Sequence, residues 1–161
     1  AGPAGVWQLF VNRKAVAMAS TPDWTVNAME AGAKVSIIPA DVYFKSMAQG
    51  ILVSDETIQK NPQLVQKLVR ATLKGMKDIM ADPKSAAVAY VAHVPTHKGK
   101  EASIQKMFEM YNKYVYANQK APGTMDEARL AELQKFYVAN GVVPTAAPLK
   151  ELYTNQFVGG K

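Results

Sequence analysis

From residue 54 onward the chain reads as a succession of amphipathic helices, and this feature restricts its fold more than any other. The longest segment, "NPQLVQKLVRATLKGMKDIMADP", covers residues 61–83 and is bracketed by Asn-Pro and Asp-Pro. Asn61 fits the N-cap of this helix, and Pro62 fits its first position, where a backbone amide hydrogen is not needed. Residues at helical spacing then predict a packed face of Leu64, Val65, Leu68, Ala71, Thr72, Gly75, Met76 and Ile79.

Capping residues and helix breakers predict further helices in the same part of the chain. They are a short helix after a Ser54 cap, a helix from an Asp82 cap to Val94, one over residues 100–118, one opened by a capping box of Thr124 with Glu127 and stopped at Gly141, and a last short one near Pro148.

The first third of the chain has a different pattern, with short apolar runs of strand length. We predict three strands, at residues 14–20, 34–39 and 50–53. Two helices accompany them, one over residues 4–11 and one from Pro22 to about Ala31. The expected fold class is therefore α/β, with the strands in the first third of the chain and helices in the rest. Three short strands can scarcely form a complete sheet for so many helices, so either some helices pack only on each other or strands are missing.

Composition excludes several kinds of site. The 161 residues include no cysteine, which excludes disulfides, thiolate nucleophiles and cysteine-ligated zinc, and fits an oxidising bacterial compartment. The net charge is +6, but the lysines are spaced along the helices, which indicates solvated faces rather than an anion-binding block. The beginning "AGPAGVWQLF" lacks the pattern of a signal peptide, and with no initial methionine we expect a processed protein or a piece of a longer one.

The order of motifs supports a family assignment. They are Ser54-Asp55 after a short strand, Asn61-Pro62, a helix centre with Ala71, Thr72 and Gly75, Asp82-Pro83 before an alanine-rich helix, and a closing "LYTNQF". In this order and spacing, residues 4–158 resemble solute-binding proteins of the nitrate, sulfonate and taurine transporter group, which includes the NMT1/THI5-like domains.

This resemblance implies the two-lobed periplasmic-binding-protein-like (type II) fold, of which the chain resembles only the C-terminal half. Residues 1–40 would then end the second lobe, residues 41–50 would form a crossover or hinge, and residues 51–161 would return to the first lobe. The N-terminal half of the same protein would be a partner that supplies the missing strands. The long helix over residues 61–83 resembles one that packs on the sheet of one lobe.

The best candidate for a ligand site is "ASTPDWT", where a predicted strand ends and a helix begins. Ser20 and Thr21 could donate hydroxyl and amide hydrogens to a carboxylate or sulfonate, and Trp24 could stack on a ligand. Alternatively, Thr21 only caps the helix and Trp24 is core. Asp23 argues against an anion, because its carboxylate would compete for the same helix end. Tyr43, near the expected hinge, is a further candidate, with ordinary packing as its alternative.

Other chemistries are disfavoured. His93 and His97 have the spacing of a zinc pair, but Pro95 between them breaks the helix that would align them. Tyrosines near Lys113 accompany no nucleic-acid reading motif. We therefore expect no metal, cofactor or nucleic acid.

The resemblance implies a periplasmic component of an ABC transporter, either secreted or lipid-anchored in a Gram-positive cell. It would capture a small polar or anionic organic solute of the sulfonate, nitrate, taurine or carboxylate class and deliver it to an inner-membrane permease. Two alternatives remain. One is a sensor or interaction domain of the same fold. The other is an enzyme resembling thiamine-pyrimidine synthases, whose activity is associated with a cysteine-rich motif that this chain lacks.

Overall fold

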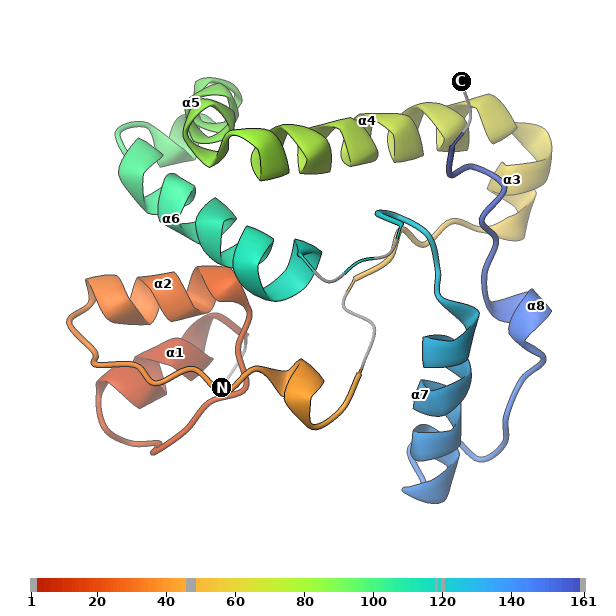
Figure 1. Ribbon diagram of the computed structural model, residues 1–161, viewed down its shortest axis with the longest axis horizontal. Coiled ribbons are helices and arrows are strands. Elements are labelled where there is room, and N and C mark those ends of the chain that lie inside the picture. Colours follow the sequence, from red (N-terminus) through yellow and green to blue (C-terminus); the bar gives the residue numbers. More distant parts are fainter. Residues whose placement is uncertain (1–2, 46–48, 118, 120, 160–161) are drawn as a thin grey trace. The chain divides into compact units, whose positions relative to one another are not determined.

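The computed structural model describes residues 3–45, 49–117, 119 and 121–159, and the regular structure of these residues is helical (Figure 1). The helices are α1 Pro3–Val11, α2 Pro22–Glu30, η1 Ala40–Val42, α3 Asp55–Lys60, α4 Pro62–Ala81, α5 Pro83–His93, η2 Pro95–His97, α6 Glu101–Tyr111, η3 Asn112–Tyr116, α7 Glu127–Ala139 and α8 Leu149–Leu152.

The prediction of three strands is wrong for the part of the chain that the structure describes. Residues 14–20, 34–39 and 50–53 have no strand pairing there. A strand exists only through hydrogen bonds to a neighbouring strand, and these segments do not supply one another with that partner. Their apolar side chains consequently reach solvent: Val16 is 100% exposed and Leu52 is 98% exposed. The α/β class is therefore not realised within these residues.

Three predicted helix starts are confirmed by side-chain caps. The Ser54 hydroxyl accepts from the Thr57 amide at 3.2 Å, and Asn61 Oδ1 accepts from the Leu64 amide at 3.3 Å. Asp82 Oδ1 accepts from the amides of the third and second residues after it, at 3.0 and 3.1 Å. These local bonds satisfy amides that have no partner inside the helix, which explains why the sequence alone located the starts.

The predicted capping box of Thr124 and Glu127 is wrong. Helix α7 begins at Glu127, and Asp126 is its N-cap, with the side chain accepting from the Arg129 amide at 3.2 Å. Aspartate is as good a cap as threonine, and here it stands two positions closer to the helix.

One compact unit comprises residues 1–38 and 77–118. Its hydrophobic core is formed by Ala87 and Val91 of α5 and Ile104 of α6, with Met107 and Phe108 packed against them. Helices α5 and α6 are neighbours, as are α1 and α2 (Figure 1). Helix α2 is anchored by Val26, which is only 2% exposed.

The second compact unit comprises residues 39–76 and 119–161. Phe44 packs on Phe136 of α7, with ring centroids 4.6 Å apart. The Arg129 guanidinium donates to the Asp41 carboxylate at 3.1 Å and ties η1 to the same helix. The assignment of residues 1–40, 41–50 and 51–161 to lobes and a hinge stays a prediction.

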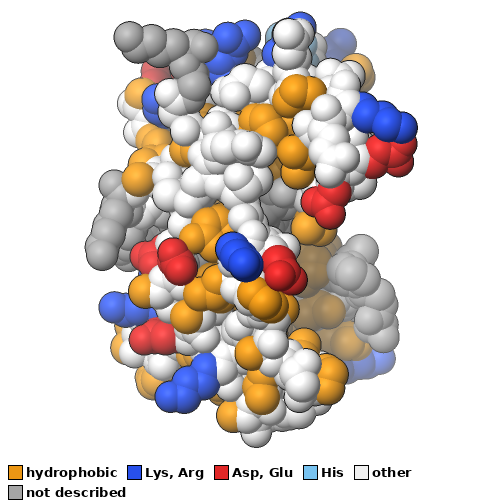
Figure 2. Space-filling model, turned by 90° about the vertical axis from the view of Figure 1, so that its right-hand side faces the viewer, with side chains coloured by type: hydrophobic (Ala, Val, Ile, Leu, Met, Phe, Trp, Pro, Cys, Tyr) orange, Lys and Arg blue, Asp and Glu red, His pale blue; other side chains and the backbone are white. Residues whose placement is uncertain are grey.

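Helix α4 follows its predicted bounds, but its predicted face is only partly covered. Val65 is buried, and Met76 and Ile79 are half-buried. Leu64 and Leu68, placed in the same face by the sequence, are 54% and 48% exposed. Hydrophobic side chains reach the surface among charged ones in the view of Figure 2. Within the described residues, no helix is both long and apolar enough to cross a membrane.

Candidate ligand site

Hydroxyl groups gather at the start of α2, where the sequence predicts a ligand. Thr21 is the N-cap residue, with Pro22 at the first helical position, but its side chain makes no cap bond. The Ser20 and Thr25 hydroxyls lie 3.2 Å apart, and both reach the Thr21 carbonyl oxygen, at 2.9 and 3.1 Å. These hydroxyls are therefore engaged with the backbone of the helix start.

Two tyrosines from the end of α6 and from η3 complete this cluster. The Tyr111 hydroxyl donates to Asp23 Oδ1 at 3.1 Å, across 88 positions of sequence. The rings of Tyr111 and Tyr116 stack with centroids 5.8 Å apart and planes 26° apart. Burial, followed by the neighbouring Asp23 carboxylate, raises the pKa of Tyr111 to about 12. Burial also raises the pKa of Tyr116. Both phenols are therefore neutral hydrogen-bonding groups at physiological pH.

The second tyrosine is carried by a π-helical turn. Helix α6 widens at Asn112–Tyr116, and the Ala117 amide bonds to the Asn112 carbonyl at 3.0 Å. Such turns are uncommon and recur at functional sites. The Asn112 side chain donates to the Ile79 carbonyl at 2.9 Å, while its Oδ1 is buried without a hydrogen-bond partner among the described residues. The widened turn brings Tyr116 back onto Tyr111.

This arrangement is better suited to an uncharged aromatic group than to an anion. The first turn of α2 already holds the Asp23 carboxylate, which takes the favourable position for negative charge at a helix start. A sulfonate placed there would face that carboxylate at close range and would be repelled. The rings of Tyr111 and Tyr116, stacked on each other, add aromatic surface next to this carboxylate.

The structure brings together some of the predicted site residues and not others. Ser20 and Thr21 belong to the cluster, and Trp24 is half-buried in the first turn of the same helix. Tyr43 belongs to the other compact unit and is 79% exposed.

Sequence reasoning did not find the contribution of Tyr111 and Tyr116. From the sequence, the tyrosines near Lys113 are considered only as a nucleic-acid surface, and neither residue is given a role in ligand binding. The one available signal was their spacing of five, which places two side chains on one side of a π-helical turn but not of an α-helix.

Each unit also has an open hollow of about 410 Å³. The hollow in the first unit lies along α2 and α6 and is lined by Val26, Met29, Glu30, Lys106, Glu109, Met110 and Lys113. It shares no residue with the hydroxyl and tyrosine cluster.

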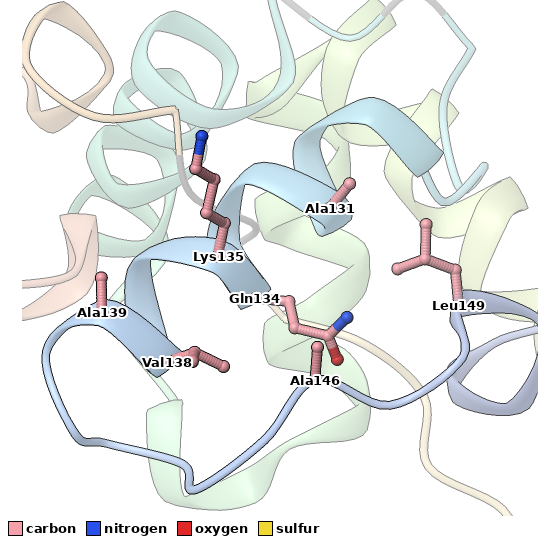
Figure 3. Close-up of a pocket in the computed structure, with 7 residues that line it drawn as sticks. All are labelled: Ala131, Gln134, Lys135, Val138, Ala139, Ala146 and Leu149. Carbon is pink, nitrogen blue, oxygen red and sulfur yellow. The ribbon is translucent and has the colours of Figure 1, made fainter.

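The hollow in the second unit lies between α7 and the return segment that leads to α8 (Figure 3). Gln134 points from α7 toward Ala146, whereas the Lys135 amine points away from it. The Gln134 amide donates to the Ala147 carbonyl at 2.9 Å and accepts from the Ala147 amide at 2.8 Å. This side chain therefore fastens the return segment, and the lining is mostly apolar.

The two histidines that have the spacing of a zinc pair each have a different partner in the structure. His93 Nδ1 lies 2.9 Å from the Ala89 carbonyl oxygen, and the His97 ring stacks on Tyr90 with centroids 5.5 Å apart. Within the described part of the chain, no group of three or more potential metal ligands is found.

Comparison with known families places this geometry in context. Residues 4–86, just over half of the chain, match the family described as NMT1/THI5 like. The chain belongs to the NMT1/THI5-like family. This membership confirms the resemblance seen in the sequence and implies a periplasmic-binding-protein-like fold.

A relative of this NMT1/THI5-like chain is a riboflavin-binding protein, RibY, from Chloroflexus aurantiacus. The two are 29% identical over 133 residues, which is 80% of this chain and 38% of the relative. The chain thus spans well under half of the relative's length. No solved structure gives a significant match.

Proposed function

We propose that this chain is part of a solute-binding protein that captures a small organic molecule without transforming it. The observation that carries the proposal is the NMT1/THI5-like match over residues 4–86, together with a relative named for the solute that it binds. The cluster at the start of α2 is the part of the chain proposed to contact the solute, through Ser20, Thr21 and Trp24. Tyr43, which the sequence predicts as a ligand-binding residue, is proposed as a further contact with the solute.

The proposed ligand is a flat, uncharged aromatic molecule with polar groups, of which riboflavin is the first to test. Stacked Tyr111 and Tyr116 can pack on such a ring system, and their neutral hydroxyls can hydrogen-bond to its polar edge. The Asp23 carboxylate in the first turn disfavours the sulfonate, nitrate, taurine and carboxylate class that the sequence had suggested.

The proposed setting is the periplasm, with an ABC permease in the inner membrane as the partner that receives the solute. Capture would involve closure of two lobes about a hinge, as in other proteins that bury a ligand between domains. The remaining part of the polypeptide would supply the rest of the cleft.

Calorimetry on the complete natural polypeptide tests this function. The titrants are riboflavin, a thiamine-type pyrimidine, taurine, an alkanesulfonate, nitrate and a small carboxylate. We expect saturable heat with an aromatic titrant and none with the anions. Saturation by an anion alone would overturn the ligand class. Formation of a new compound from any titrant would overturn the binding function in favour of an enzyme.

A further inference from the structure

Asn112, where α6 passes into η3, makes a hydrogen bond that the end of α4 requires. The last bond of the helical pattern in α4 runs from the Asp82 amide to the Asp78 carbonyl, at 3.0 Å. The next carbonyl, that of Ile79, would pair with the amide four residues on, but that residue is Pro83, which has no amide hydrogen. The Asn112 side chain supplies a donor instead, with Nδ2 at 2.9 Å from the Ile79 oxygen.

This bond fixes the orientation of the Asn112 amide. Because Nδ2 donates to a carbonyl, Oδ1 points another way, where it is buried without a hydrogen-bond partner among the described residues. An unpaired buried acceptor lowers stability, and native structures keep few of them. Asparagine at this position is therefore better explained by the geometry that it fixes than by a gain in stability.

The geometry that Asn112 fixes is the start of the π-helical turn. Helix η3 begins at this residue, and its carbonyl accepts from the Ala117 amide at 3.0 Å. Turns of this kind are rare, so other contacts have to hold the chain in this widened form. Tyr111 is held by its bond to Asp23, and Asn112 by its bond to Ile79. Two consecutive residues at the turn are thus tied to α2 and to the end of α4.

The register of this turn determines whether Tyr116 reaches Tyr111. In an α-helix, two residues five positions apart lie about 140° apart around the axis, which would separate their rings. In the π-helical turn the two rings stack, with centroids 5.8 Å apart. A return of residues 112–116 to the α-helical register would therefore take Tyr116 away from Tyr111.

We propose that Asn112 is a positioning residue of the candidate ligand site. By donating to the Ile79 carbonyl, it holds the π-helical turn that places Tyr116 on Tyr111. This inference rests on the proposed function, in which these two rings pack on the flat ring system of the solute. Asn112 acts through Tyr116 and is not itself a contact of the solute.

Asn140 makes a similar bond elsewhere and provides a matched control. It is the C-cap residue of α7, in the second unit, and its side-chain nitrogen donates to the Phe136 carbonyl at 2.8 Å. Asn140→Leu removes the same kind of contact with a helix-end carbonyl as Asn112→Leu, but far in sequence from the tyrosines. Tyr116→Leu defines the spectral signal and the share of binding that come from the second ring.

The test measures near-ultraviolet circular dichroism and riboflavin affinity of these variants in the complete natural polypeptide. We expect Asn112→Leu to lose the same tyrosine signal as Tyr116→Leu and to bind riboflavin about ten-fold more weakly, which is the value of one aromatic contact. Asn112→Leu should weaken binding no further when Tyr116 is already replaced, because both changes remove the same contact. Asn140→Leu should leave the signal and the affinity unchanged.

Two results would overturn the inference. One is an unchanged tyrosine signal in Asn112→Leu. The other is an equal weakening of riboflavin binding by Asn112→Leu with and without Tyr116, which would mean that Asn112 does not act through that ring. Should Asn112→Leu fail to fold in thermal unfolding, Asn112→Asp is judged by the same criteria, since a carboxylate keeps the shape but cannot donate. A natural polypeptide that binds no riboflavin would contradict the proposed function, while the tyrosine signal would still decide this inference.

Discussion

At the scale of single residues, the contact between Tyr111 and Asp23 connects two segments that are far apart in the sequence. A phenol that donates to a carboxylate at 3.1 Å loses this bond when it ionises, and the resulting phenolate would face a negative charge. Burial of the ring opposes ionisation further and is the larger cause of the raised pKa. The contact therefore links the stability of the first unit to pH in the alkaline range.

We predict that stability falls as the pH rises from about 10 toward 12. The pKa of a tyrosine in an unfolded chain is about 10. Folded Tyr111 keeps its proton until about 12. Between these values the unfolded state binds fewer protons than the folded state, so the free energy of unfolding decreases with pH. Denaturant unfolding at several alkaline pH values measures this slope.

Two variants separate the causes of that slope. Tyr111→Phe removes the phenol and should give a flatter dependence of stability on pH. Asp23→Asn keeps the shape of the side chain but removes its charge, and should give an intermediate slope because the effect of burial remains. An unchanged slope in Tyr111→Phe would show that this contact does not control the alkaline transition.

At the scale of helices, local chemistry determines where each element begins. Ser54, Asn61 and Asp82 all accept hydrogen bonds from amides two or three residues farther on. Such bonds depend on a few consecutive residues, and the starts of α3, α4 and α5 could therefore be predicted from sequence. The start of α7 was wrongly assigned to Thr124, because threonine and aspartate are both good caps and the capping-box pattern favours Thr124.

We predict that Asp126→Ala lowers the free energy of unfolding by about 1 kcal/mol through loss of the α7 cap. Thr124→Ala is the matched control and should change stability by no more than about 0.5 kcal/mol, as for most surface substitutions. Urea unfolding followed by circular dichroism measures both. A larger loss in Thr124→Ala than in Asp126→Ala would restore the capping box predicted from the sequence.

Strands and packed faces were less predictable than caps. An apolar run such as residues 14–20 is compatible with a strand, but pairing depends on a second segment that the run itself does not specify. The face of α4 shows the same limit. Helical spacing located its apolar side, but which part of that side is covered depends on distant residues such as Phe157. The tyrosines of the candidate site were missed because the contact of Tyr111 with α2 is also distant in sequence.

At the scale of the whole molecule, membership in the NMT1/THI5-like family and the open apolar surfaces lead to one account. Helices α5 and α6 of the first unit share a buried core, yet Val16, Leu52, Leu64 and Leu68 remain exposed. Under the proposed function, the rest of the polypeptide completes a cleft for a flat solute.

The most direct test of this account is a fluorescence titration of riboflavin with the complete natural polypeptide, followed by recovery and mass measurement of the ligand. We predict saturable quenching at one riboflavin per polypeptide, with a dissociation constant on the order of 1 μM or lower, and recovery of unaltered riboflavin. Recovery of a chemically altered product, or the absence of saturable binding by riboflavin and every other solute of the calorimetric panel, would contradict the account.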